Sequence, residues 1–176
     1  MSEFVKIVEV GPRDGLQNEK TPLTLEQRKA LILDLMKTGL KSIEVGSCVS
    51  EKWVPQMAQS DVLFAQLPKD PNIQFSLLTP NLKGFESARA VGCQEVAVFT
   101  AASESFTQKN INCSIDESLE KFSDVMAAAK ASNIKVRGYV SCMVDCPYEG
   151  AIDPQRVAKV SKRLLDMGCY EVSLGE

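Results

Sequence analysis

Gly39-Leu40-Lys41-Ser42-Ile43-Glu44-Val45 decides the fold class, because the same arrangement returns twice later in the chain. It recurs as Gly92-Cys93-Gln94-Glu95-Val96-Ala97-Val98 and as Gly168-Cys169-Tyr170-Glu171-Val172-Ser173-Leu174. Each copy has a glycine of the kind that ends a helix, then three linking residues and a short apolar strand. Repeated strand and helix units predict parallel strands joined by right-handed crossovers. We therefore expect an α/β fold, either a doubly wound sheet or a (β/α)₈ barrel.

The strands predicted around this repeat are short runs of β-branched and other apolar residues. There are six of them: Phe4–Val10, Ser42–Gly46, Ile73–Thr79, Glu95–Phe99, Lys135–Cys142 and Tyr170–Leu174. No glycine-rich nucleotide-binding motif follows the first run, so a nucleotide-binding version of the fold is less favoured. A complete barrel has eight strands in about 250 residues. The chain of 176 residues is expected to be one domain, 1–176, and if the fold is a barrel it holds only the first six strands of an incomplete one.

Helix starts are marked by side chains that cap exposed backbone N–H groups. Thr24 with Gln27 and Ser114 with Glu117 have the spacing of capping boxes, and Asp153 precedes a proline suited to a first helical turn. Apolar residues then recur every three or four positions, as expected for helices packed on a sheet. These are Ile115, Leu119, Phe122, Met126 and Ala129 after Ser114, and Val157, Val160, Leu164 and Met167 after Asp153.

The composition excludes several classes of function. The formal net charge is −3, and no basic run alternates with aromatic residues, so we expect no nucleic-acid partner. No apolar run is long enough for a transmembrane helix, so we expect no membrane partner. The six cysteines lack the spacing of a disulfide framework. A reducing compartment, the cytoplasm, fits them best.

The chain contains no histidine. A zinc site at Cys142 and Cys146 therefore has little support, and Ser-His and Cys-His catalytic pairs are excluded within this sequence. A catalytic role for Cys146 is weaker than the ordinary one of a small buried hydrophobe. Arginine, lysine, carboxylate, hydroxyl, amide or thiol groups must carry the chemistry.

An arginine and a carboxylate stand together where the first predicted strand ends, in the stretch Val8–Gln17. Arg13 in this position can stabilise a developing oxyanion, and Asp14 can hold a hard divalent cation. The alternative interpretation is a salt bridge that only closes the strand end. From the pattern alone both stay open.

Other polar residues are expected on the same face, since parallel strands present their carboxyl ends at one edge. Glu44 lies inside an apolar strand and needs a cationic partner, either Arg13 or Arg137. The connections 101–113, which holds Lys109 and Asn110, and 142–150 are long enough to form walls of an active site. The further candidates at this edge include Gln17, Ser47, Tyr139 and Ser141.

Several long motifs resemble the 3-hydroxy-3-methylglutaryl-CoA lyase family, in order and over essentially the whole sequence. They are Val5–Lys20, Lys52–Met57, Leu78–Gly84, Lys109–Ser114, Val136–Cys142 and Cys146–Gly150. The resemblance implies a TIM-barrel lyase with an HMGL-like domain, also called pyruvate carboxyltransferase-like. Such an enzyme cleaves an acyl-CoA substrate to acetyl-CoA and acetoacetate, in leucine catabolism and ketone-body formation.

The resemblance also implies residue roles. Asp14 would be a ligand of Mg²⁺ or Mn²⁺, and Arg13 would stabilise the enolate oxygen of the departing acetyl-CoA. Glu44 would support the site from the second predicted strand. Gln17, Ser47, Asn110, Tyr139 and Ser141 would line the substrate pocket. A homo-oligomer is expected for the full-length protein.

The sequence departs from the family pattern in its length. The family's His-x-His pair, a further Asn ligand and a cysteine in a Gly-Gly-Cys-Pro-Tyr loop have no counterpart, so Asp14 is the only matching metal ligand. Glu176 stands where the family usually has Asp. Two alternatives follow: a catalytically inactive fragment that persists by association, or a related condensing enzyme such as an isopropylmalate synthase.

Overall fold

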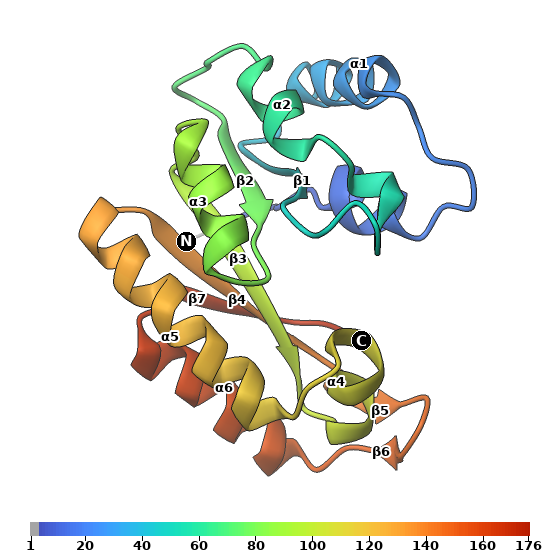
Figure 1. Cartoon of the computed structure of the whole chain (residues 1–176), viewed down its shortest axis with the longest axis vertical. Coiled ribbons are helices and arrows are strands. Elements are labelled where there is room, and N and C mark those ends of the chain that lie inside the picture. Colours follow the sequence, from blue (N-terminus) through green and yellow to red (C-terminus); the bar gives the residue numbers. More distant parts are fainter. Residues whose placement is uncertain (1–3) are drawn as a thin grey trace. The chain divides into compact units, whose positions relative to one another are not determined.

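The computed structural model describes residues 4–176 and has two compact units (Figure 1). The first consists of the chain up to Thr79 together with Glu86–Glu95, and the second consists of Pro80–Phe85 together with Val96–Glu176. Helix α3 (Leu82–Ala90) and strand β3 (Glu95–Ala101) both contain a boundary between the units.

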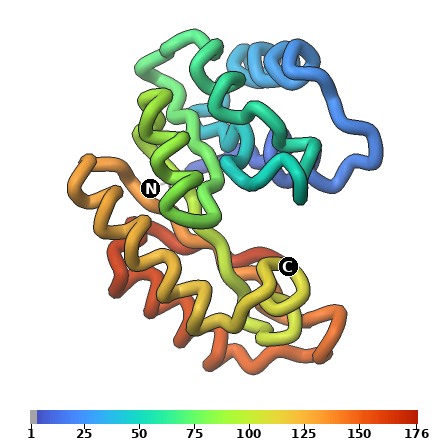
Figure 2. The backbone as a smooth tube through the Cα atoms, viewed as in Figure 1, coloured from blue at the N-terminus to red at the C-terminus, as the bar shows by residue number. Residues whose placement is uncertain are grey.

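The first unit is built on two parallel strands, β1 (Ser42–Ser47) and β2 (Gln74–Leu78). Ile43 lies opposite Phe75, and the register shifts between Glu44 and Gly46, which marks a β-bulge. The remaining elements are a five-residue π-helical turn (Gly11–Gly15), α1 (Leu25–Met36), a 3₁₀ turn (Pro55–Met57) and α2 (Ser60–Ala65). An irregular segment, 18–24, leads to α1 and is dark blue in Figure 2. The unit's core includes Ile32, Ile43, Val45, Leu63 and Leu77.

The predicted first strand, Phe4–Val10, is wrong. In this segment only Glu9 bridges to β1, opposite Ile43, through Glu9 N–H to the Ser42 carbonyl (2.9 Å) and Glu44 N–H to the Glu9 carbonyl (2.8 Å). Three of the five large apolar side chains of the run, Phe4, Val5 and Ile7, are 92, 76 and 65% exposed. Because no described residues cover them, the apolar pattern lacks the burial that stabilises a strand.

The second unit holds strands β3, β4 (Lys135–Ser141) and β7 (Glu171–Leu174), neighbours in that order. β4 and β7 are parallel, with Tyr139 opposite Ser173. Helices α5 (Ile115–Ser132) and α6 (Pro154–Met167) lie side by side and pack against β4 (Figure 1). The unit is completed by α4 (Glu104–Ile111) and by a small antiparallel hairpin, β5 (Asp145–Cys146) with β6 (Gly150–Ala151).

The predicted helices are confirmed, together with their caps. Both capping boxes form, and the Asp153 side chain accepts a hydrogen bond from Gln155 N–H. The predicted apolar stripes of α5 and α6 are buried, apart from Met167, which is half-buried. The repeat glycines Gly39, Gly92 and Gly168 all have positive φ, of 89°, 81° and 116°. Glycine adopts positive φ without strain, which explains why it occupies this position in each copy of the repeat.

The two long connections are not simply loops. The segment 101–113 contains α4, whose first turn is capped by Ser103 through Phe106 N–H. The segment 142–150 contains β5 and the turn of the hairpin. Both elements are short, which leaves little periodic apolar signal to predict them from.

Trp53, the single tryptophan of the chain, is 80% exposed in the loop after β1, with the Lys52 ammonium 5.9 Å from its ring. Among the described helices, none has the length and apolar character needed to cross a bilayer.

Candidate active site

The π-helical turn Gly11–Gly15 presents the arginine and carboxylate singled out in the sequence. Asp14 N–H and Arg13 N–H both donate to the Val10 carbonyl, at 2.7 and 3.0 Å. Glu9 braces the start of the turn, because its Oε1 accepts from Gly11 N–H at 2.6 Å. Proline at position 12 suits the first turn. The residues Glu9–Gly15 therefore form a compact turn that fixes the backbone of Arg13.

Arg13 lies between two carboxylates of different exposure. Its Nε donates to Glu44 Oε1, and its Nη1 donates to Asp14 Oδ1 at 2.7 Å. The Glu44 side chain is 1% exposed, whereas that of Asp14 is 56% exposed. A buried carboxylate on β1 thus holds the guanidinium in place, and an exposed carboxylate stands beside it. Of the two partners expected for Glu44, Arg13 is confirmed.

Arg137 instead pairs within the second unit. Its Nε lies 2.8 Å from Glu171 Oε1, and its Nη2 donates to the Tyr170 hydroxyl at 3.0 Å. The side chain is almost fully buried between β4 and β7. Arg137 therefore ties two neighbouring strands of that unit together.

Gln17 and Ser47 also belong to the first unit. Gln17 is half-buried in the helical turn that follows Gly15. Ser47 ends β1 and is buried, with its hydroxyl donating to the Leu78 carbonyl at 3.4 Å. Both lie on the elements that carry Arg13 and Glu44, and their roles in substrate binding stay predictions.

The remaining candidates belong to the second unit. Asn110 lies in the last turn of α4 and is exposed, so the expectation that it stands on a loop is wrong. Tyr139 and Ser141 are half-buried on β4, and Ser141 contributes its carbonyl to Ala102 N–H at 2.9 Å. Their predicted contacts with substrate also stay predictions.

Asp14 is the candidate metal ligand that the sequence singled out. Asp14 offers an exposed carboxylate, a hard oxygen donor of the kind Mg²⁺ and Mn²⁺ prefer. However, residues 4–176 contain no group of three or more His, Cys, Asp or Glu side chains placed to hold an ion. Asp14 fits as one ligand, but this part of the chain does not by itself form a metal site.

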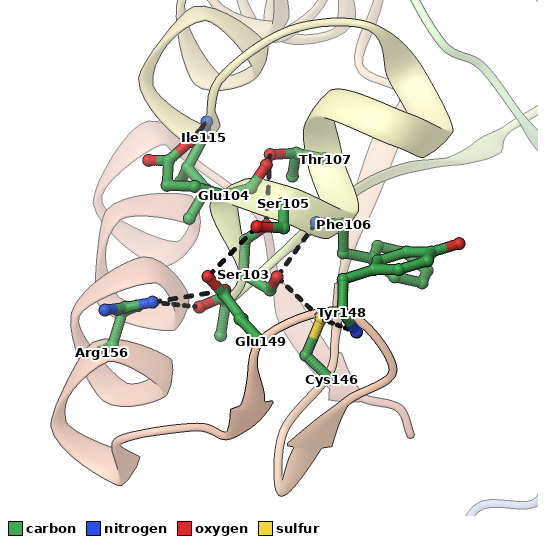
Figure 3. A network of polar contacts seen from close by, with 11 residues as sticks. Ser103, Glu104, Ser105, Phe106, Thr107, Ile115, Cys146, Tyr148, Glu149 and Arg156 are labelled. Carbon is green, nitrogen blue, oxygen red and sulfur yellow. Dashed lines mark hydrogen bonds and ion pairs between the residues drawn. The ribbon is translucent and has the colours of Figure 1, made fainter.

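A polar network that the sequence did not point to surrounds Cys146 (Figure 3). The Cys146 sulfur lies 3.0 Å from the Ser103 hydroxyl and accepts from Tyr148 N–H at 3.4 Å. Burial raises the pKa of the Cys146 thiol, but the Ser103 hydroxyl and backbone N–H groups outweigh it, so the pKa lies below its ordinary value. Desolvation instead raises the pKa of Cys142 to about 12.

Glu149 extends the same network. It accepts from the Ser105 hydroxyl at 3.4 Å and pairs with Arg156 of α6 at 3.5 Å. The Lys109 ammonium lies 3.9 Å from the Tyr148 ring centre, within cation–π range. The turn of the hairpin is thus fastened to α4 and α6 through polar contacts.

Comparison with known proteins gives a consistent result. The HMGL-like family model matches residues 4–176. A hydroxymethylglutaryl-CoA lyase of Pseudomonas mevalonii is 56% identical over 174 residues, which cover 99% of this chain and 58% of that protein. The chain therefore spans little more than half the length of such relatives.

Solved structures agree with this. The crystal structure of hydroxymethylglutaryl-CoA lyase from Pseudomonas aeruginosa is 56% identical with a TM-score of 0.95, covering 98% of this chain and 57% of that one. An HMG-CoA lyase from Acinetobacter baumannii, in complex with coenzyme A and 3-methylmalate, is 28% identical with a TM-score of 0.93. That match covers 99% of this chain and 58% of that one.

These matches confirm the expected fold, part of a TIM barrel with parallel strands. They extend over both units and include the turn that carries Arg13 and the strand that carries Glu44. In sequence and structure the chain resembles hydroxymethylglutaryl-CoA lyases, and it belongs to the HMGL-like family.

Proposed function

We propose that this chain provides the Arg13 side of the active site of an enzyme that cleaves 3-hydroxy-3-methylglutaryl-CoA to acetyl-CoA and acetoacetate. The observation that carries the proposal is the Arg13 guanidinium, buried between Glu44 of β1 and the exposed Asp14. The lyase names of the relatives, and the coenzyme A in the Acinetobacter baumannii structure, support an acyl-CoA substrate. Leucine catabolism and ketone-body formation are the processes that this reaction would serve.

The reaction needs a fixed cation for a specific reason. Breaking the C2–C3 bond leaves its electron pair on C2, and the charge spreads to the thioester oxygen as an enolate. The C3 hydroxyl loses its proton and becomes the ketone of acetoacetate, and the enolate takes up a proton to give acetyl-CoA. A guanidinium held in place before the charge develops stabilises the enolate without reorganising. Arg13 would fill this role, and Glu44 would hold Arg13 in position.

Asp14 would act as a ligand of a divalent cation, Mg²⁺ or Mn²⁺. Such a cation supplies charge stabilisation and lowers the pKa of a bound hydroxyl. Asp14 is the one candidate ligand assigned in this chain. We further expect a homo-oligomer in the cytoplasm. All six cysteines are free thiols, which supports a reducing compartment.

The test compares two proteins. The chain of 176 residues, assayed with 3-hydroxy-3-methylglutaryl-CoA and Mg²⁺ or Mn²⁺, is expected to give negligible acetoacetate, because a lone carboxylate makes an incomplete metal site. The chain fused to the part of the Pseudomonas mevalonii relative that lies beyond the match is expected to cleave the substrate.

Arginine variants of the fusion then test the proposed role. Arg13→Lys should lower kcat by about 10²-fold, the scale of losing one preorganised donor to an oxyanion. Arg89→Lys, an exposed arginine paired with Glu86, should leave kcat unchanged. A folded fusion that fails to cleave the substrate, or that instead condenses acetyl-CoA with an oxo acid, would contradict the proposal.

A further inference from the structure

The bulge in β1 lies between Glu44, to which the proposed function gives a role, and Ser47, which is predicted to line the substrate pocket. Glu44 lies opposite Ser76, whereas Gly46 lies opposite Leu77, so one extra residue is accommodated before Ser47. A bulge changes the direction in which the following side chains point. The conformation of this bulge therefore determines how Glu44 and Ser47 are placed relative to each other.

The hydroxyl of Ser60, the first residue of α2, reaches the backbone at the end of this bulge. Ser47 N–H donates to Ser60 Oγ at 3.1 Å, and Ser60 Oγ donates to the Met57 carbonyl at 2.7 Å. Ser60 is only 3% exposed. Its hydroxyl thus satisfies a backbone N–H of β1 that would otherwise be buried without a partner.

Arg28, on α1, holds this hydroxyl from the other side. Its Nη2 donates to Ser60 Oγ at 2.9 Å, and its Nη1 donates to the Ala58 carbonyl at 2.6 Å. The side chain is 3% exposed, and desolvation lowers the pKa of its guanidinium. Its contacts among the described residues are with neutral oxygens. Burying a cation without a carboxylate partner costs stability, so a gain in stability alone is a poor explanation for this arginine.

Gly46 fits against the same two side chains without spare room. A Cβ at this position would lie 2.5 Å from Ser60 Oγ, 2.8 Å from Ser60 Cβ and 3.0 Å from Arg28 Nη2. Any larger residue would push β1 away from α1 and α2. Arg28, Gly46 and Ser60 therefore make one tightly fitted group, here termed the β1 clamp.

We propose that Arg28 and Ser60 are positioning residues, which fix the bulge of β1 and thereby place Ser47 and Glu44 for substrate binding and catalysis. The catalytic part of this inference rests on the proposed function. The mechanical part does not, because it concerns hydrogen bonds and packing within the first unit. A different experiment tests each part.

The mechanical part is tested by amide hydrogen exchange in the full chain. Ser60→Ala and Arg28→Lys should each speed exchange at the Ser47 amide about tenfold or more, since local opening is then easier. Ser161→Ala, which removes a hydroxyl bonded to the Val157 carbonyl on α6, should leave it unchanged. Gly46→Ala should also speed it, because the added Cβ would displace Ser60 Oγ. Unchanged exchange at Ser47 in Ser60→Ala would overturn the inference.

The catalytic part is tested by steady-state kinetics of the fusion protein described above. Ser60→Ala and Arg28→Lys should raise KM about tenfold, the effect of losing one well-placed hydrogen bond, whereas a loss of folded protein alone would lower kcat and leave KM unchanged. KM values equal to that of the parent would overturn the positioning role. If the parent fusion has no activity, the proposed function fails, and the exchange results alone decide for or against the clamp.

Discussion

At the residue scale, the contrast between Glu44 and Asp14 shows how burial sets the worth of a charge. Both carboxylates contact Arg13, but the Glu44 side chain is 1% exposed and that of Asp14 is 56% exposed. Water screens an exposed pair and resolvates either partner when the pair is broken. Water does not replace a lost partner in a buried pair, so removing one charge leaves the other buried and unpaired.

Neutralising the two carboxylates should therefore have unequal effects on stability. Glu44→Gln is expected to lower the free energy of unfolding by about 3 kcal/mol, because it leaves Arg13 buried beside a neutral amide. Asp14→Asn is expected to cost less than about 1 kcal/mol, as for exposed ion pairs. Urea denaturation followed by far-ultraviolet circular dichroism measures both. Equal losses would show that burial is not the deciding factor.

The thiol of Cys146 provides a second prediction at this scale. The Ser103 hydroxyl lies 3.0 Å from the sulfur and lowers the pKa of that thiol. Removing this donor in Ser103→Ala destabilises the thiolate, so the pKa of Cys146 should rise. Titration of the Cys146 Cβ carbon-13 resonance measures it. Ser105→Ala, which removes a hydroxyl bonded to Glu149 instead, is the control, and an equal rise in both variants would contradict the assignment.

At the element scale, α5 depends on its capping box. Ser114 N–H donates to Glu117 Oε2 at 2.7 Å, and Glu117 N–H donates to the Ser114 hydroxyl at 3.1 Å. The hydrogen bond from the Ser114 backbone N–H, and to a smaller extent that from the Ser114 hydroxyl, holds the pKa of the Glu117 carboxyl below its usual value of 4.5. The carboxylate therefore stabilises the helix above that pH, and this contribution is lost as the pH falls through the lowered pKa.

Ser114→Ala should accordingly destabilise the chain by about 1 kcal/mol, the usual cost of an N-cap. It should also raise the pKa of Glu117, because one of its hydrogen-bonding partners is lost. Denaturant unfolding at neutral and acidic pH, with carbon-13 titration of Glu117, checks both effects. Ser123→Ala, an exposed serine in the middle of the same helix, should change neither quantity.

The elements also show what the sequence could predict. Capping boxes and apolar stripes lie within a few residues of each other, so α1, α5 and α6 follow from local sequence. The run Phe4–Val10 has strand composition but needs a covering layer, and its side chains Phe4, Val5 and Ile7 are exposed. The short hairpin β5–β6 has too few residues for a recognisable period.

For the candidate site, the pairing of Glu44 with a cation was predictable because a buried carboxylate requires one. The β1 clamp was not predictable, since Arg28 and Ser60 are 32 positions apart. Only the packing of α1 and α2 on β1 brings these two residues together. Neither side chain belongs to a motif that would have indicated the contact.

At the scale of the whole molecule, β7 is the last strand of its sheet. Among the described residues β4 is its one strand neighbour, and Leu174 on β7 is 50% exposed. A strand edge with exposed apolar groups can pair with another chain. This edge is a physical basis for the alternative that the chain is an inactive fragment that persists by association.

Self-association through β7 predicts a specific difference between two leucines. The chain should form concentration-dependent oligomers in sedimentation velocity, and Leu174→Lys should shift them towards monomer, because an edge lysine opposes strand pairing. Leu165→Lys, at a leucine of α6 that is 48% exposed, should have little effect. A monomer at all concentrations would contradict the open-edge argument.

The position of Trp53 determines what the intrinsic fluorescence of this protein can measure. Its indole is 80% exposed and is the only one in the chain. Emission in the native state is thus expected to resemble that of a hydrated indole and to change little in denaturant. The same fluorophore is open to acrylamide quenching. It is therefore a poor indicator of global unfolding but a sensitive local probe for anything that docks against the loop after β1.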